Sequence, residues 1–269
     1  MGTEIQYMTG MIIQQDCLEW MSSQPDDSID IIVSSPPYNI NIQYNTYSDR
    51  KENYISWMHS VWNEATRILK PTGHLFLNIQ PTRDNPLMPY AVVSGIDWRI
   101  QNTFIWNKSM EIDGYVRGHG YAVTTSRHYI PNGWEYVFHL TQKGRTPINL
   151  QDSGVPYQPE WAESNSKRTG RTWRPTMNSW FIPYETNGAK SNKTLANGKK
   201  HPAVYPRALV KKCLQVSGAQ PEHIVYDPFG GTGTTALAAK EYGCKWITTE
   251  IDPDYVEFIK QRCNKGENK

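Results

Sequence analysis

A strand, a glycine-rich turn, a helix and a second strand follow one another near the C-terminal end of the chain. Apolar residues predict the first strand at 225–227, and the segment 230–233 supplies a turn with three glycines. We expect a helix over 236–242 and a second strand over 245–249. Two strands joined through a helix usually lie parallel in one sheet. This unit therefore predicts an α/β fold.

The same turn has the features of a nucleotide-binding site. Gly231 and Gly233 after a strand let the backbone approach a ligand closely. Glu250, at the end of the second strand, can accept hydrogen bonds from ribose hydroxyls. The motif alone leaves open a NAD-dependent oxidoreductase, although little chain follows the turn to complete a dinucleotide fold.

A second constrained stretch is Ser34-Ser35-Pro36-Pro37-Tyr38-Asn39, which follows an apolar run at 29–33. The run predicts a buried strand. Neither proline can donate a backbone N–H and each fixes its own φ, so the strand ends in a rigid tip. The tip carries a hydroxyl, carbonyl groups and an aromatic ring, which can grip a planar group bearing an amine. By itself, a strand followed by a Pro-Pro turn explains the stretch better.

Together the two motifs resemble those of the DNA amino-methyltransferases, which methylate exocyclic amines of cytosine or adenine with S-adenosylmethionine. The residues Ser35-Pro36-Pro37-Tyr38 resemble the catalytic motif of that family, and 227–233 resembles its cofactor motif, D-P-F-x-G-x-G. The order of the motifs is similar to the beta arrangement, in which the target-recognition region lies between them. The resemblance implies a Rossmann-like methyltransferase fold with a doubly wound, mostly parallel sheet.

The resemblance also implies a cofactor site. His201-Pro202 resembles the segment that helps to bind the methionine part of the cofactor, and an Asp-Cys pair before the catalytic strand lies near its adenine. We also expect Asp16 to cap a helix, which is compatible with that role. The expected cofactor-binding residues are Asp16, Cys17, His201, Pro202, Asp227, Phe229, Gly231, Gly233, Thr234 and Glu250.

In the implied reaction, Ser35 Oγ and the Pro36 carbonyl accept hydrogen bonds from the target amine, while Tyr38 stacks on the base. Because an amine inside a duplex is inaccessible, the base must be flipped out. Serine at position 35 favours cytosine N4, since adenine-N6 enzymes usually have aspartate there. Asn39 after the tyrosine is also found among adenine enzymes, so adenine N6 remains the alternative.

The rest of the chain alternates between predicted helices and strands. We expect a helix over 54–69, stopped by residues 70–73, and the strands 102–107 and 134–140 should pair antiparallel at one edge of the sheet. The polar loop 39–53 is either a lid over the bound base or a plain surface loop. Further predicted elements are strands at 11–14 and 74–79, a helix at 207–214 and a final helix through Val256, Ile259 and Cys263.

Residues 143–200 lose hydrophobic periodicity and combine basic with aromatic side chains. Basic residues bind phosphates and aromatic residues stack on bases, so we expect an inserted target-recognition region. It divides the fold into a catalytic half, 1–142, and a cofactor-binding half, 201–269. A weaker candidate is 117–129, and a solvated loop is the alternative for both. The expected DNA-binding residues are Lys167, Arg168, Arg171, Trp173 and Arg174.

A net charge of +2 means that double-stranded DNA, the expected partner, must bind to a local basic patch. The four cysteines and seven histidines show no zinc spacing, so we expect no metal. With no signal pattern and no membrane-length apolar run, we expect a cytoplasmic protein of a prokaryote or phage-infected cell. The resemblance suggests restriction–modification or phage self-protection. Beta-type enzymes are often homodimers, but the sequence leaves the oligomeric state open. It also leaves open a methyltransferase of RNA or protein, or a non-catalytic nucleic-acid-binding module.

Overall fold

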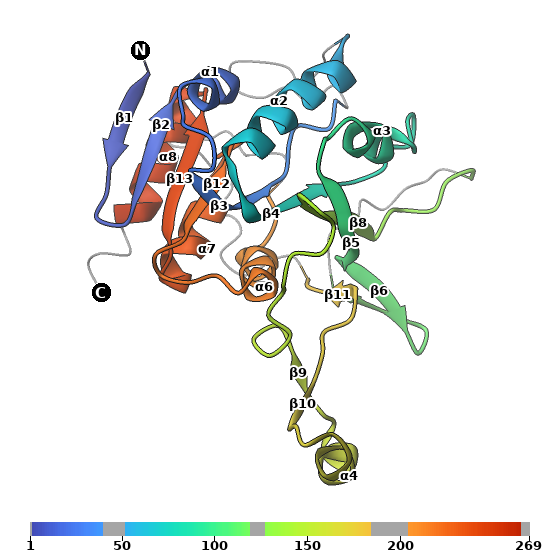
Figure 1. Ribbon diagram of the computed structural model, residues 1–269. Helices are drawn as coiled ribbons and strands as arrows, with labels where there is room; N and C mark the ends of the chain where they lie inside the picture. The colour runs from blue at the N-terminus through green and yellow to red at the C-terminus, as the bar shows by residue number, and fades with distance from the viewer. Residues whose placement is uncertain (1, 40–51, 119–126, 184–203, 265–269) are drawn as a thin grey trace.

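The computed structural model describes residues 2–39, 52–118, 127–183 and 204–264. These residues form a nine-stranded mixed sheet with helices on both faces (Figure 1), which confirms the predicted α/β class. The sheet strands, in spatial order, are β1 (Thr3–Gln6), β2 (Gly10–Gln14), β13 (Lys245–Glu250), β12 (Ile224–Asp227), β3 (Ile29–Ser34), β4 (Leu69–Ile79), β8 (Trp134–Thr141), β5 (Arg99–Asn107) and β11 (Ser179–Phe181).

The central strands β2, β13, β12, β3 and β4 run parallel to one another. Antiparallel strands flank them, because β1 pairs with β2 on one side and β8 pairs with β4 on the other. The predicted antiparallel pair is observed as β5 with β8. Its expected place at the edge is wrong, since β11 adds a parallel strand outside β5.

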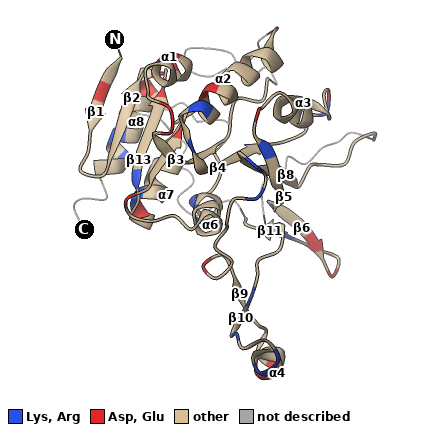
Figure 2. Cartoon of the chain, in the orientation of Figure 1, with Lys and Arg blue, Asp and Glu red and all other residues tan. Residues whose placement is uncertain are grey.

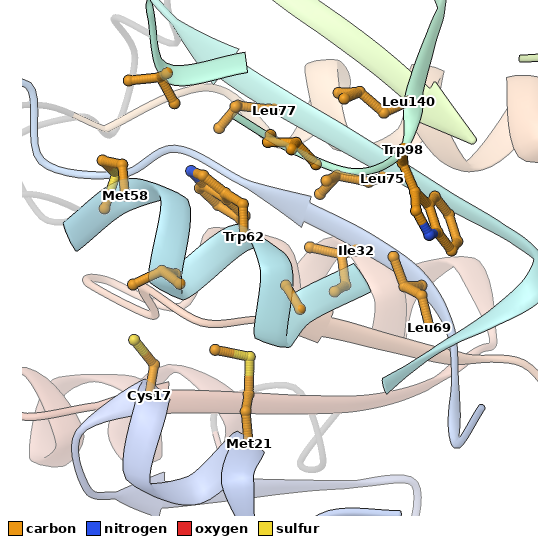
Figure 3. Close-up of a cluster of buried hydrophobic side chains, with 14 of the residues drawn as sticks. Cys17, Met21, Ile32, Met58, Trp62, Leu69, Leu75, Leu77, Trp98 and Leu140 are labelled. Carbon is orange, nitrogen blue, oxygen red and sulfur yellow. The ribbon is translucent and has the colours of Figure 1, made fainter. Parts of the chain in front are cut away.

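Helices cover the two faces of the sheet in two groups that follow chain order. One face packs against α1, α2 and α3, and the other against α6, α7 and α8. In Figure 3, Trp62 of α2 lies over Ile32 and Leu75, from adjacent strands of the first face. The helix bounds are α1 (Cys17–Ser22), α2 (Tyr54–Ile68), α3 (Met88–Ser94), α6 (Arg207–Ser217), α7 (Thr234–Tyr242) and α8 (Pro253–Asn264).

Helix α2 confirms the predicted amphipathic helix, and the apolar stripe along it belongs to the core. The segment expected to stop the helix, 70–73, instead lies within strand β4, which begins at Leu69. Leu69 pairs with Ile29 and His74 pairs with Ile31, so the register shifts between these two pairs. Pairing with β3 on both sides of the shift keeps the segment in the strand despite its proline and glycine, residues that alone would disfavour it.

Two arms extend away from the sheet (Figure 1). One is the antiparallel hairpin of β6 (Ser109–Ile112) and β7 (Tyr115–Gly118), whose turn residues Asp113 and Gly114 both have positive φ. The other consists of the paired strands β9 (Val155–Pro156) and β10 (Trp173–Arg174) with helix α4 (Pro159–Thr169) between them. Helix α4 has no buried residue, so it does not contribute to the core.

Candidate active site

The carboxyl ends of β3 and β12 bring the two sequence motifs together. These strands are parallel neighbours, with Ile32 opposite Tyr226. The residues that follow, Ser34 and Asp227, are joined by a hydrogen bond of 2.6 Å from the Ser34 hydroxyl to Asp227 Oδ1. In open α/β sheets, ligands bind at the carboxyl ends of strands where the winding direction reverses. The motifs lie at such a point, because the chain winds to one side from β3 and to the other from β12.

The proline tip after β3 is held in place by a contact with α2. Pro36 and Pro37 are buried, while Ser35 and Tyr38 are half-buried. The Tyr54 hydroxyl of α2 donates a 2.7 Å hydrogen bond to the Pro37 carbonyl. With the φ angles of both prolines fixed, this contact leaves the tip little freedom.

Tyr38 connects the tip to polar residues on neighbouring strands. Its hydroxyl lies 2.9 Å from Ser35 Oγ and donates to Glu135 Oε2 at 2.9 Å. Asn78 Oδ1 is a more distant acceptor at 3.5 Å. Part of the ring packs against the core cluster beneath α2. The hydroxyl therefore has a hydrogen-bonding role besides the predicted stacking on the base.

The carboxylate of Glu135 is buried and accepts hydrogen bonds on both oxygens. Lys108 Nζ donates to Oε1 at 2.9 Å, and Asn78 Nδ2 donates to Oε2 at 2.9 Å. Both Lys108 and Glu135 are 4% exposed. Buried charges are expensive unless they are paired, so the ion pair and the Asn78 amide together keep the charged carboxylate at this depth.

Asn78, Lys108 and Glu135 were not predicted to be site residues from the sequence. The available signal was a polar residue inside an apolar strand: Asn78 follows three apolar residues of β4, and Glu135 is the second residue of β8. Because β8 runs antiparallel to β4, the start of β8 lies at the same edge of the sheet as the end of β4.

The glycine-rich turn after β12 adopts the tight geometry that its composition predicts. Gly231 and Gly233 have φ of 50° and 75°. Gly230 donates to the Thr249 carbonyl at 2.9 Å, and a Cβ on Gly230 would lie 2.5 Å from Thr248 Oγ1. The turn is thereby fixed against the end of β13, with the N-terminus of α7 following directly.

Glu250 lies at the end of β13, as predicted. Its Oε2 accepts from the Gly231 amide at 2.7 Å and its Oε1 from the Asp252 amide at 2.9 Å. Burial raises the pKa of its carboxyl to about 7, although these amides oppose the shift. A carboxylate offers about four acceptor sites, so Glu250 retains capacity for a further donor.

Asp227 is directed toward the protein. Its Oδ1 accepts from Ser34 and from the Phe229 amide, and its Oδ2 accepts from the Tyr205 hydroxyl at 3.0 Å. Burial raises the pKa of its carboxyl to about 6, against the effect of these donors. Asp227 therefore organises the turn and the segment before α6, whatever contact it makes with a cofactor.

Asp16 and Cys17 follow β2, the neighbour of β13, at the same edge. As predicted, Asp16 caps α1, accepting from the Leu18 amide at 2.8 Å. The thiol of Cys17 is buried in the core, and burial raises its pKa. Any contact of Cys17 with a ligand would therefore involve its backbone.

Two further predicted cofactor residues lie on the turn. Phe229 is half-buried, with its ring edge-on to Trp57 and Trp62 at centroid distances of 5.9 and 6.0 Å. Thr234 is buried at the first position of α7. His201 and Pro202 lie outside the described residues, as does nearly all of the proposed lid.

The predicted DNA-binding residues gather on the arm that contains α4 (Figure 2). Lys167 and Arg168 lie in the last turn of α4, and Trp173 and Arg174 form β10. The Arg171 guanidinium lies 5.0 Å from the centre of the Trp173 ring. An open groove of about 610 Å³ on this arm is lined by residues that include Tyr157, Trp161, Arg168 and Arg174.

Trp180, one of the aromatic residues assigned to the recognition region, lies in the core. It is 5% exposed and stacks on Phe104 with ring centroids 4.2 Å apart. Strand β11 carries it into the sheet, so a role in base stacking is wrong for this residue. Trp161, by contrast, is 61% exposed.

The described part of the chain contains no group of three or more His, Cys, Asp or Glu residues placed to hold a metal ion. The four cysteines are free thiols, and all are buried. None of the helices in residues 2–39, 52–118, 127–183 and 204–264 is long and apolar enough to cross a membrane.

Comparison with known proteins gives three kinds of match. Residues 29–261 match the N6/N4 methyltransferase family model, described as "DNA methylase". The chain is 26% identical over 260 residues to the DNA adenine methyltransferase YhdJ of Escherichia coli K12. The aligned region covers 93% of this chain and 81% of that protein.

Among solved structures, the cytosine-N4-specific PvuII DNA methyltransferase superimposes with a TM-score of 0.71 at 21% identity, covering 96% of this chain and 87% of that one. The M1.HpyAVI–SAM complex superimposes with a TM-score of 0.57 at 17% identity, covering 93% of this chain and 98% of that one.

Proposed function

The chain belongs to the DNA methylase family whose model it matches, and on this basis we propose that it methylates the exocyclic N4 amine of a flipped-out cytosine, with S-adenosylmethionine as donor. The observation that carries the proposal is the junction of the two motifs at one edge of the sheet, where Ser34 and Asp227 are hydrogen-bonded. A methyl donor in the glycine-rich turn and an amine at the proline tip would thus be neighbours.

The residues of the turn fit S-adenosylmethionine. Glu250 can accept hydrogen bonds from ribose hydroxyls. Such added donors would stabilise its charged carboxylate and lower its pKa, which is raised to about 7. Gly230 and Gly233 pack so closely against Thr248 and Ile259 that neither position has room for a side chain, which holds the turn in its tight conformation. When bound, S-adenosylmethionine supplies a methyl group on a sulfonium centre, already electrophilic without a metal.

The difficulty of the reaction lies in the amine, whose lone pair is delocalised into the base. Ser35 Oγ and the Pro36 carbonyl accept hydrogen bonds from its two N–H groups. These acceptors favour a tetrahedral nitrogen and stabilise the positive charge that develops on it. Because Tyr54 and the prolines hold the tip, the acceptors are positioned in advance, and orientation supplies much of the acceleration.

The serine at position 35 favours cytosine over adenine as the target base, since adenine enzymes of this family usually have aspartate there. Adenine N6 is the second candidate, favoured by Asn39, whose positive φ of 57° shapes the end of the tip. The two bases share the exocyclic amine chemistry, so the mechanism is the same for either.

We assign DNA contact to the arm of β9, α4 and β10. Lys167, Arg168, Arg171 and Arg174 provide charge for phosphates, and the exposed Trp161 provides a ring for stacking. The ion pair of Lys167 with Glu163 joins two exposed side chains, so it costs little to exchange for a phosphate. Flipping the base costs a few kcal/mol, which such contacts offset. A role in restriction–modification follows from the family resemblance.

The test combines the purified protein with unmethylated genomic DNA from several sources and tritiated S-adenosylmethionine. Nucleoside digestion and mass spectrometry then identify the labelled base. We expect N4-methylcytosine, with no label for Ser35→Ala. N6-methyladenine would overturn the base assignment and keep the reaction, whereas cofactor binding without transfer to any DNA would overturn the activity.

A further inference from the structure

Beyond the acceptors at the tip, we infer that Glu135 fixes the direction of a hydroxyl chain that ends at Ser35. The chain runs from Ser35 Oγ through the Tyr38 hydroxyl to Glu135 Oε2, with two links of 2.9 Å. Glu135 thus acts through Tyr38 as a positioning residue for Ser35. This inference rests on the proposed function for its catalytic consequence.

The direction follows from counting donors. The carboxylate of Glu135 can only accept, and the Tyr38 hydroxyl has one proton, which it donates to Oε2. In the contact between Tyr38 and Ser35, the serine must therefore be the donor. With its own proton committed to Tyr38, Ser35 Oγ can act only as an acceptor toward any further group.

Glu135 is anchored so that it cannot turn away. Lys108 Nζ binds Oε1, and Asn78 Nδ2 binds Oε2 while also donating to the Tyr136 carbonyl at 3.0 Å. Asn78 and Glu135 lie on β4 and β8, which are paired in the central sheet, and Lys108 directly follows β5 of the same sheet. Such preorganised polar groups require little rearrangement during a reaction.

The consequence is that the tip presents an acceptor to the target amine. If the chain ran in the opposite direction, Tyr38 would donate to Ser35 and occupy one of its lone pairs. The Ser35 proton could then point toward the amine, where it would repel the N–H groups. Glu135 prevents this arrangement.

The decisive variant is Glu135→Gln, which keeps the size of the side chain. Lys108 is the charged donor, so the amide oxygen of glutamine would face Lys108, and the NH₂ group would replace the oxygen that accepts from Tyr38 and Asn78. That NH₂ would donate to the Tyr38 hydroxyl and reverse the chain. We expect kcat to fall on the order of 100-fold, as for loss of one preorganised catalytic hydrogen bond, with KM for cofactor and DNA within about twofold.

The direction of the chain has a second readout that does not need activity. In protein labelled with ¹³Cζ-tyrosine, the Tyr38 resonance, assigned by its loss in Tyr38→Phe, should shift in Glu135→Gln because the hydroxyl changes partner. An unchanged resonance, or an unchanged kcat in the folded variant, would overturn the inference. If the wild-type protein methylates no DNA, the proposed function fails, while the resonance still decides the direction of the chain.

Two further variants test the middle link of the hydroxyl chain and provide a control. Tyr38→Phe removes the middle link, leaves the buried ion pair intact and keeps a ring for stacking. It should lose kcat to a similar extent, so a fully active Tyr38→Phe would also overturn the inference. The matched control is Asp30→Asn, which breaks an ion pair with Lys70 at the opposite end of β3. It should keep the wild-type kcat.

Discussion

The Ser34 hydroxyl donates a 2.6 Å hydrogen bond to Asp227 across 193 residues of sequence, and both side chains are buried. This contact connects the strand that ends in the proline tip with the strand that ends in the glycine-rich turn. Burial raises the pKa of the Asp227 carboxyl to about 6, and the Ser34 donor opposes that shift.

We therefore expect Ser34→Ala to destabilise the fold by about 1–3 kcal/mol, because a buried carboxylate loses a donor. Removing this donor raises the pKa of Asp227 further. A raised carboxyl pKa gives stability at low pH that is lost as the pH rises through the folded pKa. The loss of unfolding free energy in Ser34→Ala, measured by urea unfolding, should hence be larger at pH 8 than at pH 5. Ser28→Ala, which removes a surface hydroxyl bonded to the Pro25 carbonyl, is the control. Equal deficits at both pH values would contradict the expectation.

The two glycines that flank α7 give a matched pair. Gly233 and Gly243 both have positive φ, but a Cβ on Gly233 would lie 2.8 Å from Ile259, whereas a Cβ on Gly243 would meet nothing within 4 Å. In each alanine variant, backbone strain should lower the free energy of unfolding by about 1–2 kcal/mol. Only in Gly233→Ala should the clash with Ile259 lower the free energy of unfolding by about 1–3 kcal/mol more. Only this variant should also bind S-adenosylmethionine more weakly, as measured by calorimetry. Equal cofactor affinity in the two variants would exclude a role for the tight turn.

The buried pair His74 and His139 predicts sensitivity to acid. Asn102 donates to His139 Nδ1 at 3.0 Å, so the ring proton of His139 is on Nε2 and bonds His74 Nδ1 at 2.9 Å. Burial lowers the pKa of His74 to about 4 and that of His139 to about 3. Stability from a lowered histidine pKa is present above the unfolded value and lost as the pH falls toward the folded value.

Between pH 6.5 and 4, protonation of His74 alone should lower the free energy of unfolding by about 3 kcal/mol, because each unit of pKa difference corresponds to about 1.4 kcal/mol. Unfolding of the double variant His74→Gln, His139→Gln should depend less on pH in this range. The same slope in variant and wild type would show that the pair does not titrate on unfolding.

On the arm, replacing Arg168 and Arg171 by alanine should weaken DNA binding without changing cofactor affinity. For every phosphate that the variant no longer neutralises, the slope of log affinity against log salt should fall by about 0.9. Fluorescence anisotropy at several NaCl concentrations measures the slope. Lys260→Ala, on α8 and paired with Glu257, is the control and should leave it unchanged. A wild-type slope in the double variant would place the DNA elsewhere.

The two tryptophans Trp161 and Trp180 should behave in opposite ways. Trp180→Ala removes a buried ring stacked on Phe104 and should cost about 3–5 kcal/mol of stability. Trp161→Ala should leave the melting temperature close to that of the wild type and raise the KM for DNA. Thermal unfolding and initial rates at varied DNA concentration separate the two effects, and a normal KM for Trp161→Ala would remove this ring from the interface.

The α/β class, the two motifs and the elements that carry them could be predicted from the sequence. These features depend on local chemistry: the consecutive Pro36 and Pro37 cannot donate hydrogen bonds to a neighbouring strand, and Gly233 permits a turn that other residues resist. Asp16 capped its helix for the same local reason. The family resemblance rests on such contiguous segments, so the sequence was sufficient for it.

The side chains that surround the proline tip and the exposure of each aromatic residue depend on the three-dimensional fold and could not be predicted from the sequence. Glu135 reaches Tyr38 because β8 pairs antiparallel with β4, and Trp180 is buried because β11 pairs with β5. Both pairings join residues far apart in the chain, and sheet register is set by packing over the whole core. A single polar residue in an apolar strand, such as Asn78, does not indicate its partner until that register is known.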